Sequence, residues 1–109
     1  MKGTGMRLET RDIETRLAAL DGWTFERGAL VRVFKFSSFP DAIAFVGRLA
    51  FEAERADHHP DLAINYRRVT VTWSTHSEGG VTEKDFAGVA QSNTIARHFL
   101  EPQAPSPKP

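Results

Sequence analysis

Three histidines in this chain have a spacing that could support proton-transfer chemistry. His58 and His59 are adjacent in the stretch Glu54-Arg55-Ala56-Asp57-His58-His59-Pro60, and His76 follows 17 residues after His59. An unperturbed imidazole has a pKa of about 6.5, so at neutral pH it can donate or accept a proton. Two or three imidazoles around one pocket could serve as acid and base on opposite sides of a substrate. The sequence therefore suggests an acid–base site.

Less specific interpretations of the histidines remain open. A charged histidine at a helix C-terminus interacts favourably with the helix dipole, by about 0.3–1 kcal/mol. Three histidines could also ligate a catalytic zinc ion, although adjacent side chains on an extended segment point in opposite directions. The chain has no cysteine, which excludes disulfides, thiolate catalysis and cysteine-based metal sites. The fourth histidine, His98, is interpreted as an ordinary surface residue.

The elements on either side of the histidines explain how they could meet. Apolar residues at helical spacing predict a helix that Ser38 caps and that ends at the histidine pair. Pro60 disfavours helical geometry for the preceding residue, so the chain bends there. Alternating strands over 62–66 and 69–73 would then form an antiparallel hairpin. That hairpin returns His76 to the histidine pair.

The remaining elements complete a repeated order of hairpin, helix, hairpin and helix, typical of a split α+β domain. A short helix over 11–20, with Thr10 as a possible cap, precedes a hairpin of strands 23–26 and 30–36. The spacing of Thr82 and Asp85 is that of a capping box, and it starts a final helix that runs to about Leu100. In the central helix, Phe45 and Phe51 lie off the apolar stripe. They either widen its buried face or meet a partner chain.

Length and composition limit the possible classes of protein. A chain of 109 residues fits one domain, here 10–100, between a flexible N-terminus (1–9) and a disordered proline-rich tail (101–109). The formal net charge is zero, which argues against direct nucleic-acid binding driven by charge. No apolar run is long enough to span a bilayer, and no signal peptide precedes the domain. We therefore expect a soluble, cytoplasmic protein without membrane association.

The spacing of the polar residues resembles the signature of the pterin-4a-carbinolamine dehydratases. The resemblance extends from about Leu8 to Leu100, and it includes the segment Leu-x-x-Leu-x-Gly-Trp near the first helix. One difference is that the family often has an aromatic residue soon after His-His-Pro, where this chain has Leu62 and Ala63. The matching positions at fixed spacing are Glu54, His58, His59, Pro60, Tyr66, His76 and Asp85.

The resemblance implies an α+β fold in which a four-stranded antiparallel sheet has three helices packed on one face. It implies a homodimer or homotetramer. It also implies dehydration of 4a-hydroxytetrahydropterin to the quinonoid dihydropterin, as in tetrahydrobiopterin recycling, with no metal and no organic cofactor. By the same resemblance, the catalytic residues are His58, His59 and His76. The residues expected to bind the pterin are Glu54, Asp57, His59, Pro60, Ser74, Thr75 and Asp85.

Two other functions remain open on the same fold. Eukaryotic members of the family also bind a transcription factor, so the chain could be a protein-binding or assembly module. An intact pterin site could instead act on another pterin, such as one on a route to the molybdenum cofactor. Binding-only relatives can lose the three histidines, whereas this chain keeps His58, His59 and His76.

Overall fold

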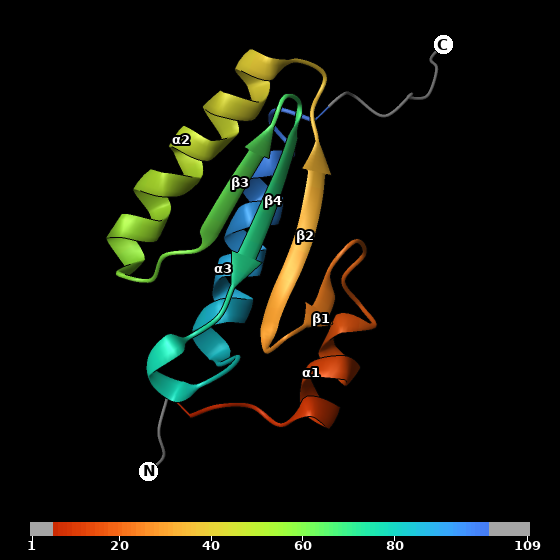
Figure 1. Ribbon diagram of the computed structural model, residues 1–109, viewed down its shortest axis with the longest axis vertical. Helices are drawn as coiled ribbons and strands as arrows, with labels where there is room; N and C mark the ends of the chain where they lie inside the picture. The colour runs from red at the N-terminus through yellow and green to blue at the C-terminus, as the bar shows by residue number, and fades with distance from the viewer. Residues whose placement is uncertain (1–5, 101–109) are drawn as a thin grey trace.

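The chain folds into an antiparallel sheet of four strands with helices packed against one face, as Figure 1 shows. The computed structural model describes residues 6–100. The predicted fold class and the order α-β-β-α-β-β-α are therefore confirmed. In chain order the elements are α1 (Thr10–Leu17), β1 (Thr24–Glu26), β2 (Ala29–Lys35), α2 (Phe39–Ala56), β3 (Asp61–Asn65), β4 (Arg68–Trp73), the 3₁₀ turn η1 (His76–Glu78) and α3 (Glu83–Ala96).

The strand order β1-β2-β4-β3 places the two long strands β2 and β4 in the centre of the sheet. Successive side chains of a strand point to opposite faces, so one face can be apolar throughout. The buried residues of β4 are Val69, Val71 and Trp73, and those of β2 include Leu30 and Phe34. β2 and β4 pair in a register that sets Leu30 opposite Trp73, so these residues share the face that the helices cover.

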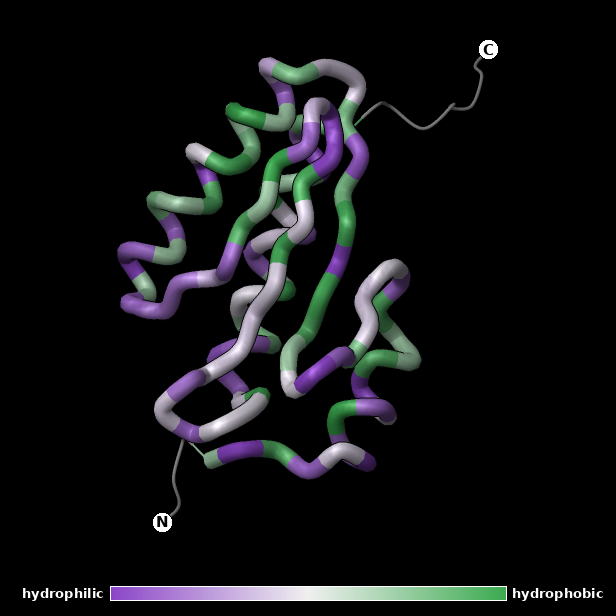
Figure 2. Tube along the Cα trace, in the orientation of Figure 1, coloured by the Kyte–Doolittle hydropathy of each residue, from purple (hydrophilic) through white to green (hydrophobic). Residues whose placement is uncertain are grey.

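Helix α2 packs on this face through one side only. Ala42, Phe45, Leu49 and Ala53 are buried, and Figure 2 shows apolar and hydrophilic positions alternating around the turns of the helix. Phe45 is fully buried and contacts Phe34 and Phe36, so it widens the buried face. Phe51 is 75% exposed and lies outside this core.

Ser38 caps α2 as predicted, since its side chain accepts a hydrogen bond from the Asp41 N–H. Other predicted boundaries were wrong. The first helix ends at Leu17 instead of residue 20, and its N-cap is Glu9, not Thr10. The third strand ends at Asn65, because the next residue has φ 56°, a value that extended backbone does not adopt. The last helix ends at Ala96, and tighter turns continue to Leu100.

The predicted flexible N-terminus and proline-rich tail fall largely outside the described residues, which exclude 1–5 and 101–109. Residues 6–9 form no helix or strand, but the Leu8 N–H donates to the Val81 carbonyl over 2.8 Å. Within residues 6–100, no helix is both long enough and apolar enough to cross a membrane.

Candidate active site

The C-terminal end of α2 positions His58 through a left-handed backbone turn. Asp57 has φ 56° and ψ 40°, a conformation that commonly ends helices. The Asp57 N–H donates to the Glu54 carbonyl and the His58 N–H to the Ala53 carbonyl, each over 3.1 Å. These bonds turn the chain back on the helix end. As a result, His58 points into the protein, while its neighbour His59 is exposed.

The His58 ring is held on two sides. Its Nε2 lies 2.6 Å from Oδ1 of Asp85. Its plane stacks on the Trp73 indole, with ring centroids 5.4 Å apart and 22° between the planes. The His58 side chain is only 14% exposed and that of Asp85 is completely buried. A histidine and a carboxylate in this arrangement form a pair in which the carboxylate orients the ring.

Asp85 is itself fixed by the N-terminus of α3. It belongs to a capping box, as the sequence predicts, in which Oδ2 accepts the Thr82 N–H over 2.9 Å. The same Oδ2 accepts the Thr75 hydroxyl over 2.7 Å. Thr75 and Thr82 are both buried, and their hydroxyl oxygens lie 2.8 Å apart. The carboxylate thus connects the end of β4, the start of α3 and the turn after α2.

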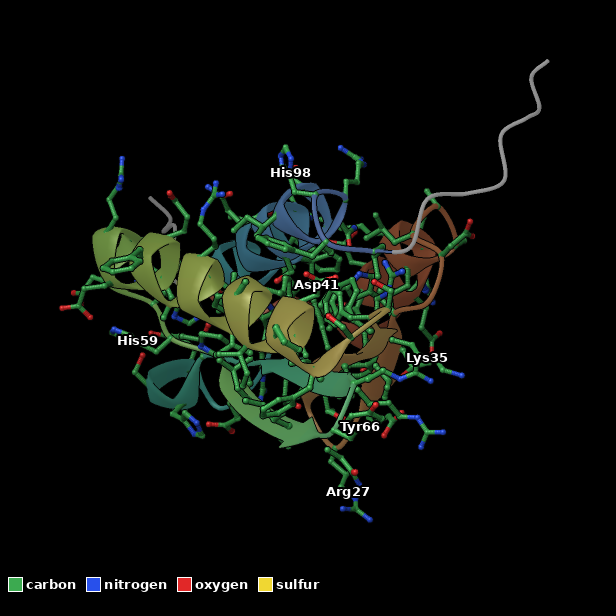
Figure 3. The ribbon with its side chains drawn as sticks, turned by 90° about the horizontal axis from the view of Figure 1, so that it is seen from above. Arg27, Lys35, Asp41, His59, Tyr66 and His98 are labelled. Atoms are coloured by element: carbon green, nitrogen blue, oxygen red, sulfur yellow. The ribbon has the colours of Figure 1, made fainter. Side chains whose placement is uncertain are left out.

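His59 pairs with a different carboxylate in a different environment. Its Nε2 lies 2.9 Å from Oε1 of Glu54, but the two side chains are 56% and 81% exposed. Figure 3 shows His59 at the surface beside the end of α2 and His98 apart from it. An exposed pair of this kind constrains its side chains little, because water competes for both partners.

The hairpin of β3 and β4 brings His76 back to the same end of the sheet, as predicted. Asp61 pairs with Thr72, so the chain after β4 runs past the turn that contains Pro60 (Figure 1). His76 starts the η1 turn and is exposed. Thr75 bridges Gly80 across this turn, which closes it.

His58 and His76 line different hollows. One hollow of about 190 Å³ lies between α2 and α3, and its wall includes His58, Trp73 and Gly88. Another, of about 360 Å³, has Ser74 and His76 in its wall together with Asp61, Thr72 and Val31. Because Val31, Thr72 and Asp61 are aligned across the sheet on the face that the helices leave open, this second hollow lies on the outer face. The end of β4 separates the two hollows.

The predicted site residues therefore form three groups. Hydrogen bonds join His58, Asp85 and Thr75, while His59 joins Glu54, and Ser74 lies beside His76. Asp57 shapes the turn through its backbone, and Pro60 leads into β3. Within residues 6–100, no three His, Asp or Glu side chains are arranged to hold a metal ion.

Two residues of the site were not predicted. Trp73 lies in the strand predicted over 69–73 and is buried, but it is also the platform on which the His58 ring stacks. Thr82 was read only as a helix cap, although its hydroxyl also joins the cluster around Asp85. The capping-box spacing, combined with the hairpin that ends just before Thr75, was the signal that could have placed Thr82 near the site.

Comparison with known proteins assigns the chain to one family. The family model described as pterin 4 alpha carbinolamine dehydratase matches residues 6–95. A relative from Sulfolobus acidocaldarius is 44% identical over 90 residues, which cover 83% of this chain and 99% of the relative. One from Roseiflexus castenholzii is 49% identical over 88 residues, 81% of this chain and 95% of the relative. Both carry provisional names as pterin-4-alpha-carbinolamine dehydratases.

Two solved structures share the fold. A crystal structure from Brucella melitensis, described as a transcriptional coactivator/pterin dehydratase, has a TM-score of 0.79 and 44% identity and covers 83% of this chain and 98% of its own. A pterin dehydratase-like protein described as a RuBisCO assembly factor has a TM-score of 0.57 and 24% identity, over 68% of this chain and 86% of its own. The chain belongs to the pterin 4 alpha carbinolamine dehydratase family.

Proposed function

We propose that this protein removes water from 4a-hydroxytetrahydropterin and gives the quinonoid dihydropterin by histidine acid–base catalysis. Membership of the family supports a dehydratase. The observation that carries the proposal is the His58 ring held 2.6 Å from the buried Asp85, at the end of the sheet where His59 and His76 also lie. An imidazole held this way is suited to directional proton transfer.

The reaction requires two proton transfers. The departing 4a-hydroxyl takes up a proton and leaves as water, while the proton on N5 of the pterin is removed. We assign these transfers to His58 and His76, and we assign binding and orientation of the substrate mainly to His59. The exposure of His59 and His76 supports direct contact with a substrate at this end of the sheet. No metal or organic cofactor enters the proposed reaction.

The assignment is tested with His58→Ala and His76→Ala in a spectrophotometric assay on a synthetic 4a-hydroxytetrahydropterin. Each variant should lower the dehydration rate by at least about tenfold, since a single acid or base typically contributes about 10²–10⁴-fold. His98→Ala, an exposed histidine apart from the site, is the matched control and should leave the rate unchanged. Circular dichroism should show the same fold in all three variants. Unchanged rates in both site variants would refute the assignment.

The same assay addresses the native substrate. Pterins with different substituents at the 6-position should be compared by kcat/KM, because a pocket discriminates substrates through transition-state binding. The roles of Glu54, Asp57, Pro60 and Ser74 in binding belong to this proposal. Their substitution should raise KM more than it lowers kcat.

We also propose that the protein is a homodimer or homotetramer. Several large apolar side chains are exposed, which is unusual for a monomer when they are contiguous. Phe51 is 75% exposed, Tyr66 is 66% exposed and Phe39 is 45% exposed, and the rings of Phe39 and Tyr66 stack with centroids 6.5 Å apart. Sedimentation equilibrium would measure the subunit number, and a monomer at all concentrations would contradict this assignment.

A protein-binding or assembly function is the second candidate. The exposed apolar side chains favour it, as does the description of the Brucella melitensis structure as a coactivator as well as a dehydratase. The two candidates differ in what the histidines do. A binding module would keep its partner affinity in His58→Ala, whereas a dehydratase would lose its activity.

A further inference from the structure

We infer that Thr75 and Thr82 are positioning residues that act on His58 through Asp85 and hold its proton on Nε2. Nδ1 is then the nitrogen that the neutral ring offers to a substrate. This inference rests on the proposed function only in treating His58 as a proton-transfer group. It replaces the pterin-binding role expected for the side chains of Thr75 and Asp85, which are 5% and 0% exposed.

The hydrogen bonds of the cluster have only one consistent direction. The Lys84 N–H donates to Oγ1 of Thr82 over 3.2 Å. The Thr75 hydroxyl donates its single proton to Oδ2 of Asp85. The 2.8 Å bond between the two hydroxyls must therefore be donated by Thr82 to Thr75. Each group in this chain therefore donates to the next, from the Lys84 N–H through the Thr82 and Thr75 hydroxyls to the Asp85 carboxylate.

The same hydrogen bonds leave Oδ1 of Asp85 to accept from His58. Oδ2 receives two donors, the Thr75 hydroxyl and the Thr82 N–H. Oδ1 lies 2.6 Å from Nε2 of His58, and an ionised carboxylate can only accept. Nε2 of His58 therefore carries a proton, and in the neutral ring Nδ1 is bare. A bare nitrogen makes His58 the base that takes the N5 proton, which leaves the acid role to an exposed histidine.

The packing around the cluster keeps the ring from turning over. Trp73 covers one face of the imidazole. The Trp73 indole is itself fixed, since its Nε1–H donates to Oγ of Ser92 over 3.0 Å in a buried site. Every buried side-chain N and O atom among the described residues has a hydrogen-bond partner, so the network is complete. A complete buried network specifies one arrangement more strongly than its separate bonds would.

The pair formed by His59 and Glu54 has a similar distance of 2.9 Å but no such support. Both of its side chains are exposed, and the structure gives Glu54 no second side-chain donor among the described residues. The difference between the two pairs therefore comes from burial and from the threonines, not from the histidine–carboxylate contact. This contrast makes Thr75 the residue to test.

The test uses Thr75→Val, which keeps the shape and removes the hydroxyl. Thr75→Ser keeps the hydroxyl. Thr70→Val is the matched control, because it removes the hydroxyl of a half-buried threonine on the opposite face of β4. Nitrogen-15 spectra of histidine-labelled protein, recorded where the His58 ring is neutral and assigned by comparison with His58→Gln, report which ring nitrogen holds the proton. Steady-state kinetics with a synthetic 4a-hydroxytetrahydropterin give kcat and KM.

The unaltered protein, Thr75→Ser and Thr70→Val should all show His58 with its proton on Nε2. Thr75→Val removes one of the two donors that hold Oδ2 of Asp85, so Oδ1 should no longer stay against Nε2 of His58, and the spectrum should show a mixture of both neutral forms. It should also lower kcat by about tenfold and change KM by less than about twofold, because small misplacement of a reacting group lowers the rate of the chemical step. Thr75→Ser should stay within about twofold of the unaltered protein in both constants.

Two results would overturn the inference. One is a His58 proton on Nδ1 in the unaltered protein, a measurement that does not depend on the folding of any variant. The other is an unchanged nitrogen-15 spectrum in a folded Thr75→Val. A change in the spectrum without any dehydration by the unaltered protein would uphold the positioning role and refute the proposed function, so the two failures can be distinguished.

Discussion

The close approach of α3 to the sheet at Gly88 leads to a quantitative prediction for Gly88→Ala. A Cβ added at Gly88 would lie 2.5 Å from Cδ2 and 2.7 Å from Cε3 of Trp73, and closer still to Cε2. All three separations are shorter than ordinary van der Waals contact. The indole cannot easily withdraw, since it is 2% exposed, bonded to Ser92 and stacked on His58.

Two opposing effects decide the magnitude for Gly88→Ala. Alanine in a helix interior is better than glycine by about 1 kcal/mol. Overpacking a well-filled core costs about 1–3 kcal/mol. With three ring atoms in conflict we take the upper half of that range, so the net loss should be about 1–2 kcal/mol. For a domain of this size, that corresponds to a decrease in Tm of at least about 4 °C.

Gly47→Ala is the control for Gly88→Ala. Gly47 also lies inside a helix, but a Cβ there would have no atom within 4 Å outside its own helix turns. Only the helix preference then remains, and Tm should rise by about 4 °C. Thermal unfolding followed by circular dichroism would measure both changes in Tm. If Gly88→Ala stabilises the protein as much as Gly47→Ala does, Trp73 can move, and the packing argument for the fixed His58 ring is wrong.

Asp57→Gly should leave the free energy of unfolding unchanged or raise it by up to about 1 kcal/mol, because glycine suits the left-handed turn at φ 56°, whereas Asp57→Ala should lower it by about 1 kcal/mol. Equal losses of activity in Asp57→Gly and Asp57→Ala would show that the Asp57 carboxylate binds the substrate. A lower free energy of unfolding for Asp57→Gly in urea would contradict the backbone role. Hydrogen bonds of 2.7 and 2.5 Å from Arg16 hold the pKa of Glu83 below its usual value. The stability from this exposed pair, less than about 1 kcal/mol after solvent screening, is therefore present at neutral pH and lost as the pH falls through the lowered pKa of Glu83. Urea unfolding gives the difference in free energy of unfolding between the unaltered protein and Glu83→Gln. This difference should shrink as the pH falls over that range, and a difference that grows on acidification would refute the ion pair.

The fold was largely predictable because each element has a strong local signal. The alternation around Val69, Val71 and Trp73 predicts a strand with one buried face, and Ser38 starts α2 as its residue type suggests. The errors lie at helix ends and at Tyr66, where tertiary packing and a positive φ decide the boundary. Such details do not follow from periodicity. Phe45 shows the same limit, since its burial depends on contacts that Phe34 and Phe36 make with it where α2 packs on the sheet.

The return of the three histidines to one end of the sheet was predictable, whereas their contacts were not. Spacing brings His76 back to His58 and His59, because two antiparallel strands of similar length return the chain to its start. Spacing does not show that Asp85 is buried or that His58 stacks on Trp73, since both depend on how α3 lies on the sheet. The sequence contains two histidine–carboxylate pairs of similar appearance, and only the fold distinguishes them.

The end of β4 explains why the three imidazoles differ. Side chains alternate along a strand, so Trp73 and Thr75 are buried under the helices while Ser74 and His76 line the hollow on the outer face. His58 turns towards the buried set and is held there, whereas His59 and His76 stay exposed. This end of the sheet therefore carries one imidazole that is held in place and two that are exposed. In the proposed dehydration, the fixed ring of His58 would suit removal of the N5 proton, and an exposed ring would protonate the departing hydroxyl.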